Sequence, residues 1–326
     1  MKWLFIIIFP VIATGQVSVS KDTVLMGSSF AFTAIAESEA IAWKSINKGI
    51  LEVGRIEQLI SSWDASSQTT KINKQAGNAP VKVDFELYQL ISRAKKVSVL
   101  SNGYFDISFA SINHIWNFSK PSISIPNQDA ITKSVELIDY RNILLNEKDT
   151  TVFLKQKGMK IGFGAIGKGY AANQAKKIMI DQGAASGVVN AGGDLISWGK
   201  KPEGHPWSIG ITDPDDDENI VFWINSSDQA VVTSGNYESY FDIDGKRYCH
   251  IINPITGWPA INLKSVTVIC PDAELADALA TTTFILGVED GLALINHLEG
   301  IECVIIDENN ALHFSTNLNP NLLSHE

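Results

Sequence analysis

Apolar residues recur every three or four positions in two long segments of the chain, 37–63 and 83–100. This period places them on one face of an amphipathic helix. Residues 168–182, 274–286 and 291–298 have similar patterns, so five helices are expected. Short apolar runs between turn residues predict strands. The predicted strands span 28–36, 151–154, 187–190, 208–212, 221–224, 230–233, 248–252, 265–270 and 301–306.

Three polar stretches interrupt this pattern. Residues 61–80 are rich in Ser, Thr, Gln, Asn and Gly and are expected to form a loop, and 121–127 is a further irregular connection. The acidic run 213–218 is expected to be a solvated loop. Strands outnumber helices and do not alternate with them regularly, which indicates an α+β fold with largely antiparallel sheets.

The composition is that of a globular protein with an acidic surface. The chain has 326 residues, 45% of them hydrophobic, and a formal net charge of −10. Nucleic acids and anionic membranes require clustered Lys and Arg, so no nucleic-acid partner is expected. An anionic ligand would need a bound cation or a local group of donors.

The first fifteen residues resemble an export signal. A positive charge at Lys2 precedes an apolar run over 3–12, and 13–15 are small residues. The run is too short to span a bilayer, so residues 1–15 are predicted to be a signal peptide and 16–326 the mature domain. An uncleaved anchor is the alternative. The protein is therefore expected to be exported, in the periplasm or facing it at the inner membrane.

Cysteine usage adds two expectations. No Cys follows the apolar run directly, so no lipid anchor is expected. The three cysteines, Cys249, Cys270 and Cys303, are scattered and odd in number, which does not suggest a disulfide framework. Cys270 and Cys303 lie in apolar strands and are expected to be buried thiols.

A glycine-rich segment, 162–169, precedes the helix at 168–182. Free backbone N–H groups and the positive end of the helix dipole would face a ligand there, and Lys168 adds a charge. The letters fit GxxxxGK, but Gly169 replaces the Mg²⁺-binding Ser or Thr of a Walker A loop. The segment therefore predicts a phosphate site that is not an NTPase site. The alternative is a turn that only packs a helix on a sheet.

Three further motifs carry candidate chemistry. Asn190 to Asp194 contains paired glycines at a strand end, and 233–237 is followed by 248–257, which includes His250. Asp277 and Thr281 are four residues apart and share one face of a helix, as oxygen ligands of a hard cation such as Mg²⁺ would. Alone, each motif has a structural alternative: a turn, a hydrogen-bonded His, or a local Asp–Thr hydrogen bond.

Together these motifs resemble the FAD:protein FMN transferases of the ApbE family. The resemblance extends from Met26-Gly27 to about residue 306. Its elements, in chain order, are Leu25-Met26-Gly27, Ser62-Trp63 through Lys71-Ile72-Asn73, Gly103-Tyr104-Phe105-Asp106, Gly164 to Tyr170, Asn190 to Asp194, Thr233 to Gly235, His250 to Gly257 and Ala276 to Thr281. The resemblance implies an α+β, T-fold-type architecture of two related lobes of mainly antiparallel sheet with packed helices, and an FAD site between the lobes.

The resemblance also implies site residues. The expected cofactor-binding residues are Met26, Trp63, Tyr104, Phe105, Asp106, Gly162, Lys168, His250 and Ile252. The expected metal ligands are Ala165, by its carbonyl, Asp277, Thr281 and the carbonyl of Ala280. His250, as general base, and Asp277 are the expected catalytic residues, although His250 could instead be only a flavin contact. Two positions depart from the family: Gly162 stands where many members have Asp, and Ser67-Gln68 where Ser-Glu is usual.

The implied reaction is Mg²⁺-dependent cleavage of FAD. A Ser or Thr hydroxyl of a partner protein attacks the FMN-side phosphorus and AMP leaves. Expected acceptors are flavoprotein subunits with a Ser/Thr flavinylation motif, such as those of Na⁺-pumping or ion-translocating reductases. This chain contains no such motif. The alternatives are an FAD pyrophosphatase, in which water replaces the hydroxyl, and a non-catalytic FAD-binding protein.

Overall fold

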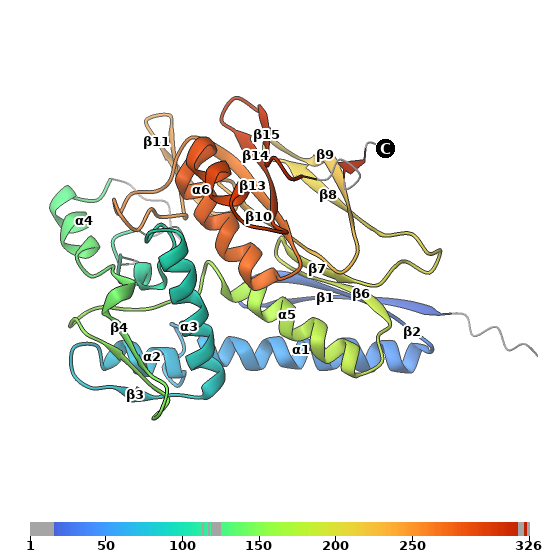
Figure 1. The fold of residues 1–326 in the computed structure, drawn as a ribbon, viewed down its shortest axis with the longest axis horizontal. Helices are drawn as coiled ribbons and strands as arrows, with labels where there is room; N and C mark the ends of the chain where they lie inside the picture. The colour runs from blue at the N-terminus through green and yellow to red at the C-terminus, as the bar shows by residue number, and fades with distance from the viewer. Residues whose placement is uncertain (1–15, 113, 117, 119–124, 319–322, 325–326) are drawn as a thin grey trace, which may run out of the picture.

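The computed structural model describes residues 16–112, 114–116, 118, 125–318 and 323–324, and its centre is an antiparallel sheet (Figure 1). Eight strands in the described residues hydrogen-bond in the order β1-β2-β6-β7-β10-β13-β14-β15. Their bounds are β1 Val17–Leu25, β2 Ser28–Ala36, β6 Ser186–Ala191, β7 Asp194–Trp198, β10 Ala230–Gly235, β13 Leu263–Cys270, β14 Glu302–Asp307 and β15 Leu312–Phe314.

The sheet has two halves with a related order of elements. The first half runs through hairpin β1–β2, helices α1 (Glu39–Ile60) and α5 (Gly167–Asp181), and hairpin β6–β7. The second runs through the antiparallel strands β10 and β13, helix α6 (Ala273–Asn296), and hairpin β14–β15. Strands β7 and β10 pair antiparallel and join the halves. The predicted α+β class with mainly antiparallel sheet is confirmed, and both related halves belong to one continuous sheet.

Helices α1, α5 and α6 pack against the sheet, and α5 also packs against both α1 and α6 (Figure 1). The helical spacing places Ile46, Val53 and Ile56 of α1 in the core, each fully buried. Alternation along the strands gives the sheet a second buried face. There Val231 and Ile269 pack against a smaller sheet of β8 (Trp207–Asp213), β9 (Asp216–Ser226) and β16 (Leu323–Ser324).

A second group of elements packs beside α1 and α6. It contains the three-stranded sheet β3-β5-β4, several helices and 3-10 turns, and the hairpin β11–β12 lies close by across an aromatic cluster. The bounds are α2 Gln68–Lys74, β3 Val81–Lys82, α3 Phe85–Leu100, η1 Ile107–Ile112, α4 Gln128–Val135, η2 Tyr140–Asn142, β4 Ile143–Asn146, β5 Thr151–Leu154, β11 Tyr240–Ile243 and β12 Lys246–Cys249.

The predicted helices and strands are present, but four details of the prediction were wrong. The expected loop 61–80 contains helix α2, whose start is capped by the Ser67 side chain, an acceptor for the Thr70 N–H at 2.9 Å. The expected strand 248–252 ends at Cys249. The acidic run is mainly the β8–β9 hairpin, because the Asp213 side chain accepts from the Asp215 N–H at 2.9 Å and stabilises the turn.

The fourth difference concerns the start of the domain. Met26-Gly27 was expected to precede the first strand of the domain. It is instead the turn between β1 and β2, with φ angles of 51° and 72°. Strand β1 lies at the edge of the sheet and exposes many polar residues, so its hydrophobic pattern is weak. The predicted signal peptide, 1–15, lies outside the described residues, and the boundary at 16 stays a prediction.

In the part of the chain that the structure describes, α6 is the one helix long and apolar enough to cross a membrane. It packs against β10, β13 and α5, and therefore serves as a core helix of this fold. A break at Gly287, whose φ is 83°, divides this element into two helical parts, in agreement with the two helices predicted at 274–286 and 291–298. The three cysteines are free and buried, which confirms the buried thiols expected for Cys270 and Cys303.

Candidate active site

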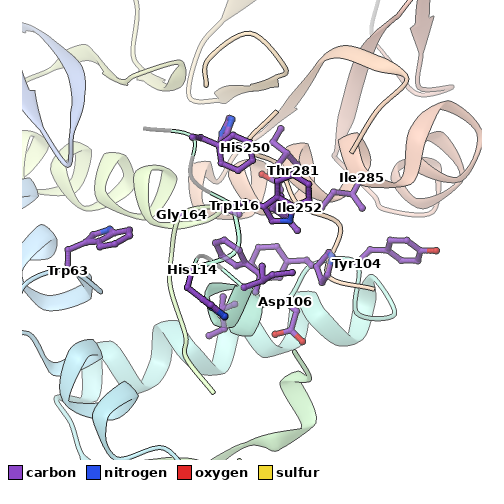
Figure 2. A pocket seen from close by; sticks show the side chains of 18 residues that line it. Trp63, Tyr104, Asp106, His114, Trp116, Gly164, His250, Ile252, Thr281 and Ile285 are labelled. Atoms are coloured by element: carbon purple, nitrogen blue, oxygen red, sulfur yellow. The ribbon is translucent and has the colours of Figure 1, made fainter. Parts of the chain in front are cut away.

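A pocket of about 640 Å³ lies where η1, the turn before α5, the segment after β12 and α6 meet (Figure 2). Its lining is largely aromatic and aliphatic, with few polar groups. The lining residues are Trp63, Tyr104, Phe105, Asp106, Ile107, Phe109, Ile112, His114, Trp116, Phe118, Gly164, Ala165, His250, Ile251, Ile252, Pro254, Thr281 and Ile285. Such a lining suits a flat, mostly apolar ligand held by a few polar contacts.

The structure brings eight of the predicted site residues into the wall of this pocket. They are Trp63, Tyr104, Phe105, Asp106, Ala165, His250, Ile252 and Thr281. The other five do not line it: Met26, Gly162, Lys168, Asp277 and Ala280. Of these, Lys168 and Asp277 belong to a polar cluster beside the pocket.

Trp63 lies at one end of the pocket and is 83% exposed (Figure 2). The segment that carries it is held in place from both sides. The Ser61 hydroxyl accepts from the Trp63 N–H at 3.2 Å, and the Ser67 hydroxyl donates to the Ser61 carbonyl at 2.5 Å. A fixed and exposed indole offers a large surface on which an aromatic ring can stack.

Asp106 has a structural task in the pocket wall. Its buried carboxylate accepts hydrogen bonds from the Ser108 N–H and hydroxyl, at 2.8 and 2.6 Å, and from the Tyr140 N–H, at 2.6 Å. Burial raises its pKa despite these bonds. In Figure 2 the carboxylate points away from His250 and Thr281. Asp106 therefore ties η1 to η2 and shapes the wall.

Lys168 is the second residue of α5, which begins at Gly167 directly after the glycine-rich turn. Its Nζ lies 3.3 Å from Asp194 Oδ2 and donates to the Gly192 carbonyl at 3.3 Å. Burial alone would lower its pKa, but the carboxylates of Asp194, Glu238 and Asp277 outweigh burial and raise it. Lys168 is thus a permanent cation at a helix N-terminus.

Asp277 approaches the same helix end from α6. Its side chain is almost fully buried, and Oδ2 accepts from the Gly169 N–H at 3.0 Å. Burial, and then the charge of Asp194, raise its pKa well above the ordinary value. A Cβ on Gly169 would lie 2.0 Å from the Ala273 carbonyl oxygen. Glycine at the position of the Walker A Ser or Thr is therefore required by the close packing of α5 on α6.

The oxygen atoms in this region suit a hard cation. Thr281 lies one turn beyond Asp277 on α6, lines the pocket, and has its hydroxyl 3.3 Å from that of Ser234. Ala165 lines the pocket just before α5, whereas Ala280 is fully buried. Among the described residues no three His, Cys, Asp or Glu side chains form a metal-binding group. A metal here would need the predicted mixture of one carboxylate, a hydroxyl and carbonyls, which is compatible with Mg²⁺.

His250 follows the last residue of β12, and its N–H donates to the Ser239 carbonyl at 2.9 Å. Burial is the largest influence on the pKa of the His250 imidazole and lowers it, and the positive charge of Lys168 lowers it further. The Glu238 carboxylate and the hydrogen bond with Ser239 act in the opposite direction, but the pKa remains below its ordinary value. The imidazole is consequently neutral at pH 7 and able to accept a proton. Its Nδ1 is buried without a hydrogen-bond partner, while Nε2 lies 3.9 Å from Glu238 Oε2.

Two predicted residues have packing contacts outside the pocket. Gly162 donates its N–H to the Ile107 carbonyl at 2.9 Å, and a Cβ there would lie 3.0 Å from the Ala110 methyl group. A larger side chain at 162 would therefore press on η1. Met26 packs beside the start of α5, since a Cβ on Gly167 would lie 3.7 Å from its terminal methyl group.

Four residues of the site had no role in the sequence prediction: Asp194, Ser234, Glu238 and Trp116. Asp194 and Ser234 lie in motifs that were recognised, but only tertiary contacts bring them to Lys168 and Thr281. Trp116 fixes the pocket's far wall by donating from Nε1 to the Gly257 carbonyl at 2.8 Å. No spacing in the sequence indicates these contacts.

The fold and the site define a class: an α+β protein with an aromatic pocket beside a lysine, a helix N-terminus and buried carboxylates. That combination suits a ligand with a flat ring system and phosphates. The chain belongs to the ApbE family, whose sequence profile matches residues 26–305.

Individual proteins support this membership. The FAD:protein FMN transferase of Klebsiella pneumoniae (strain 342) is 33% identical over 299 residues, which is 91% of this chain and 92% of the relative. The FAD:protein FMN transferase of Treponema pallidum (strain Nichols) is 34% identical, covering 77% and 73% of the two chains. The crystal structure of the ApbE protein from Thermotoga maritima is similar with a TM-score of 0.84 and 33% identity, covering 92% of this chain and 97% of that one.

Proposed function

We propose that this protein is a Mg²⁺-dependent FAD:protein FMN transferase. It cleaves FAD, attaches the FMN half to a Ser or Thr hydroxyl of a target protein, and releases AMP. The observation that carries this proposal is the meeting of the aromatic pocket with Lys168 and the N-terminus of α5. The pocket provides for the ring system and the cationic helix end for the pyrophosphate. The activity that names the relatives supports the same reaction.

The proposed reaction is a phosphoryl-type displacement. The acceptor oxygen forms a bond to the FMN-side phosphorus, the bond from that phosphorus to the bridging oxygen breaks, and AMP leaves with that oxygen. The hydroxyl proton passes to Nε2 of His250, whose lowered pKa keeps it unprotonated beforehand. Lys168 and the positive end of the α5 dipole neutralise the pyrophosphate charge, which otherwise repels the nucleophile.

Asp277, Thr281 and the Ala165 carbonyl would hold the Mg²⁺ ion, with the Ala280 carbonyl as a further candidate. The donor chemistry supports this. The two buried carboxylates, Asp194 and Asp277, share a single neighbouring cation, Lys168, so a second cation would balance their charge. When bound, Mg²⁺ would neutralise charge on the phosphate oxygens. The carboxylate of Asp277 would supply the main attraction because hard cations favour anionic oxygens.

A peptide assay tests the function. A synthetic peptide with a Ser/Thr flavinylation motif is incubated with the protein, FAD and Mg²⁺, and the products are analysed by mass spectrometry. The expected product is a peptide with the mass of one added FMN, together with AMP. A peptide with Ala in place of the acceptor residue is the control and gains no mass. Free FMN and AMP without an adduct would instead indicate an FAD pyrophosphatase, and unchanged FAD a binding protein.

The location and partners of the protein extend this proposal. The apolar segment at residues 3–12 supports export to the periplasmic side of the membrane. Acceptors would then be redox subunits exposed there, of which Na⁺-pumping or ion-translocating reductases are candidates. Cell fractionation with an antibody against the mature domain tests the location. Recovery from the cytoplasmic fraction alone would refute it.

A further inference from the structure

We propose that Glu238 is a positioning residue for His250. Its carboxylate stabilises the imidazolium that forms when Nε2 takes the proton of the acceptor hydroxyl. This inference rests on the proposed transfer reaction. The first observation is geometric: Glu238 Oε2 lies 3.9 Å from His250 Nε2, while Nδ1 of the ring is buried and has no hydrogen-bond partner. The described structure therefore gives the ring its polar contact on the Nε2 side.

The backbone fixes this pair. Tyr240 pairs with Cys249 at the base of the β11–β12 hairpin, and the His250 N–H extends the ladder by donating to the Ser239 carbonyl at 2.9 Å. Glu238 precedes Ser239 and lies in the bend before β11, outside the regular ladder. The hydrogen bond between His250 and Ser239 therefore holds the bend that carries Glu238 next to His250. The two residues are held together by a structure that is independent of any ligand.

The charges around His250 explain how Glu238 would assist proton transfer. The charged side chains that act on His250 are Glu238, from the β10–β11 connection, and Lys168, from α5. Burial and Lys168 both disfavour an imidazolium, whereas Glu238 favours it. Proton transfer from the acceptor hydroxyl creates a positive charge on the ring, and the nearby carboxylate compensates it. Without Glu238, His250 would be a weaker base in the same place.

The inference is tested by replacing Glu238 with Gln and titrating His250. Histidine labelled with ¹³C is followed by NMR, and the His250→Asn variant identifies the His250 signal. We expect the His250 pKa to fall by about one, a tenfold loss of proton affinity, in Glu238→Gln. Glu299→Gln is the matched control, since it removes the same charge from an exposed turn after α6, and it leaves the His250 pKa unchanged.

Transfer kinetics give a second readout. In Glu238→Gln the limiting rate falls about tenfold because a weaker base removes the proton less well, and the acidic limb of the pH–rate profile moves to lower pH. The KM for FAD changes less than twofold. Glu238→Asp recovers most of the rate because it restores the negative charge. If Glu238→Gln does not fold, Glu238→Asp takes its place in the titration of His250.

Two results would overturn the inference. One is a His250 pKa in Glu238→Gln equal to that in the wild type and in Glu299→Gln. The other is a kinetic defect confined to KM with an unmoved pH profile, which would make Glu238 a substrate contact. A wild-type protein that forms no adduct would refute the proposed function separately, since the titration of His250 requires neither FAD nor an acceptor.

Discussion

Replacing Asp277 with Asn tests its role as a metal ligand while leaving the fold intact. The amide has nearly the same volume as the carboxylate, and its oxygen can still accept from the Gly169 N–H, now at 3.0 Å from Oδ2. Alanine would leave that buried N–H unpaired at a cost of about 1–3 kcal/mol. Asparagine also removes an unfavourable buried charge, because burial and the neighbouring Asp194 raise the pKa of the Asp277 carboxyl and so disfavour its ionised form. The free energy of unfolding in EDTA should therefore stay equal or rise.

The magnitude for the metal follows from binding linkage. A ligand at a concentration of 100 times its dissociation constant stabilises the folded state by about 2.7 kcal/mol. For a chain of about 300 residues, an unfolding entropy of about 2.1 cal/mol/K per residue means that each kcal/mol raises the melting temperature by roughly 1.5 °C. Mg²⁺ at that concentration should thus raise the melting temperature of the wild type by roughly 4 °C, using the same two relations. Asp277→Asn should show little of this increase and no transfer.

The assay is thermal unfolding with EDTA and with increasing Mg²⁺, followed by the peptide transfer assay. Asp290→Asn is the control, because it removes an exposed carboxylate from the same helix, and it should keep both the Mg²⁺ effect and the activity. If Asp277→Asn retains the full Mg²⁺-dependent increase and normal transfer, then Asp277 is not a metal ligand and the reasoning fails.

Three further variants test the remaining groups. Lys168→Ala should weaken FAD binding and lower turnover about 10²-fold at saturating FAD, since it removes a cation from the reacting phosphates; a change in binding alone, by equilibrium titration, would make it a ground-state anchor. His250→Asn should keep fold and FAD affinity but lower the single-turnover rate at pH 7 by 10² or more, with a smaller loss at high pH where the hydroxyl ionises; an unchanged limiting rate would contradict a general base. Asp194 has its pKa raised by burial to about 6, so the folded state binds this proton more tightly than the unfolded state. Its ionisation destabilises the fold as pH rises through 4 to 6. Asp194→Asn should gain up to about 3 kcal/mol at pH 7 in EDTA and much less at pH 4, measured by denaturant unfolding; an equal effect at both pH values would refute this.

Hydrophobic periodicity predicted most of the secondary structure. Helices α1, α3 and α5 and strands such as β2 and β13 bury a continuous face or run, and burial of that surface dominates their local stability. The prediction failed where side-chain hydrogen bonds decide the structure. Helix α2 depends on the Ser67 cap, and the β8–β9 turn on Asp213, within segments whose composition is typical of loops.

The candidate site was predicted because its chemistry lies in short contiguous motifs. Glycines and a lysine before a helix indicate phosphate binding, and an Asp and a Thr one turn apart indicate a hard cation, whatever the rest of the fold. Of the eight predicted residues that line the pocket, Thr281 follows from these local rules, and the other seven were assigned by the family resemblance.

Tertiary structure alone decided the electrostatic setting of that site. Asp194 and Glu238 are 26 and 70 residues beyond Lys168 in the chain, and the β6–β7 turn and the segment after β10 bring their charges to it. Glycine at 169 looked like a missing metal ligand, yet the contact between α5 and α6 excludes any side chain there. A sequence specifies which groups are present, but pKa values depend on burial and on charges a few ångströms away, and these exist only once the chain has folded.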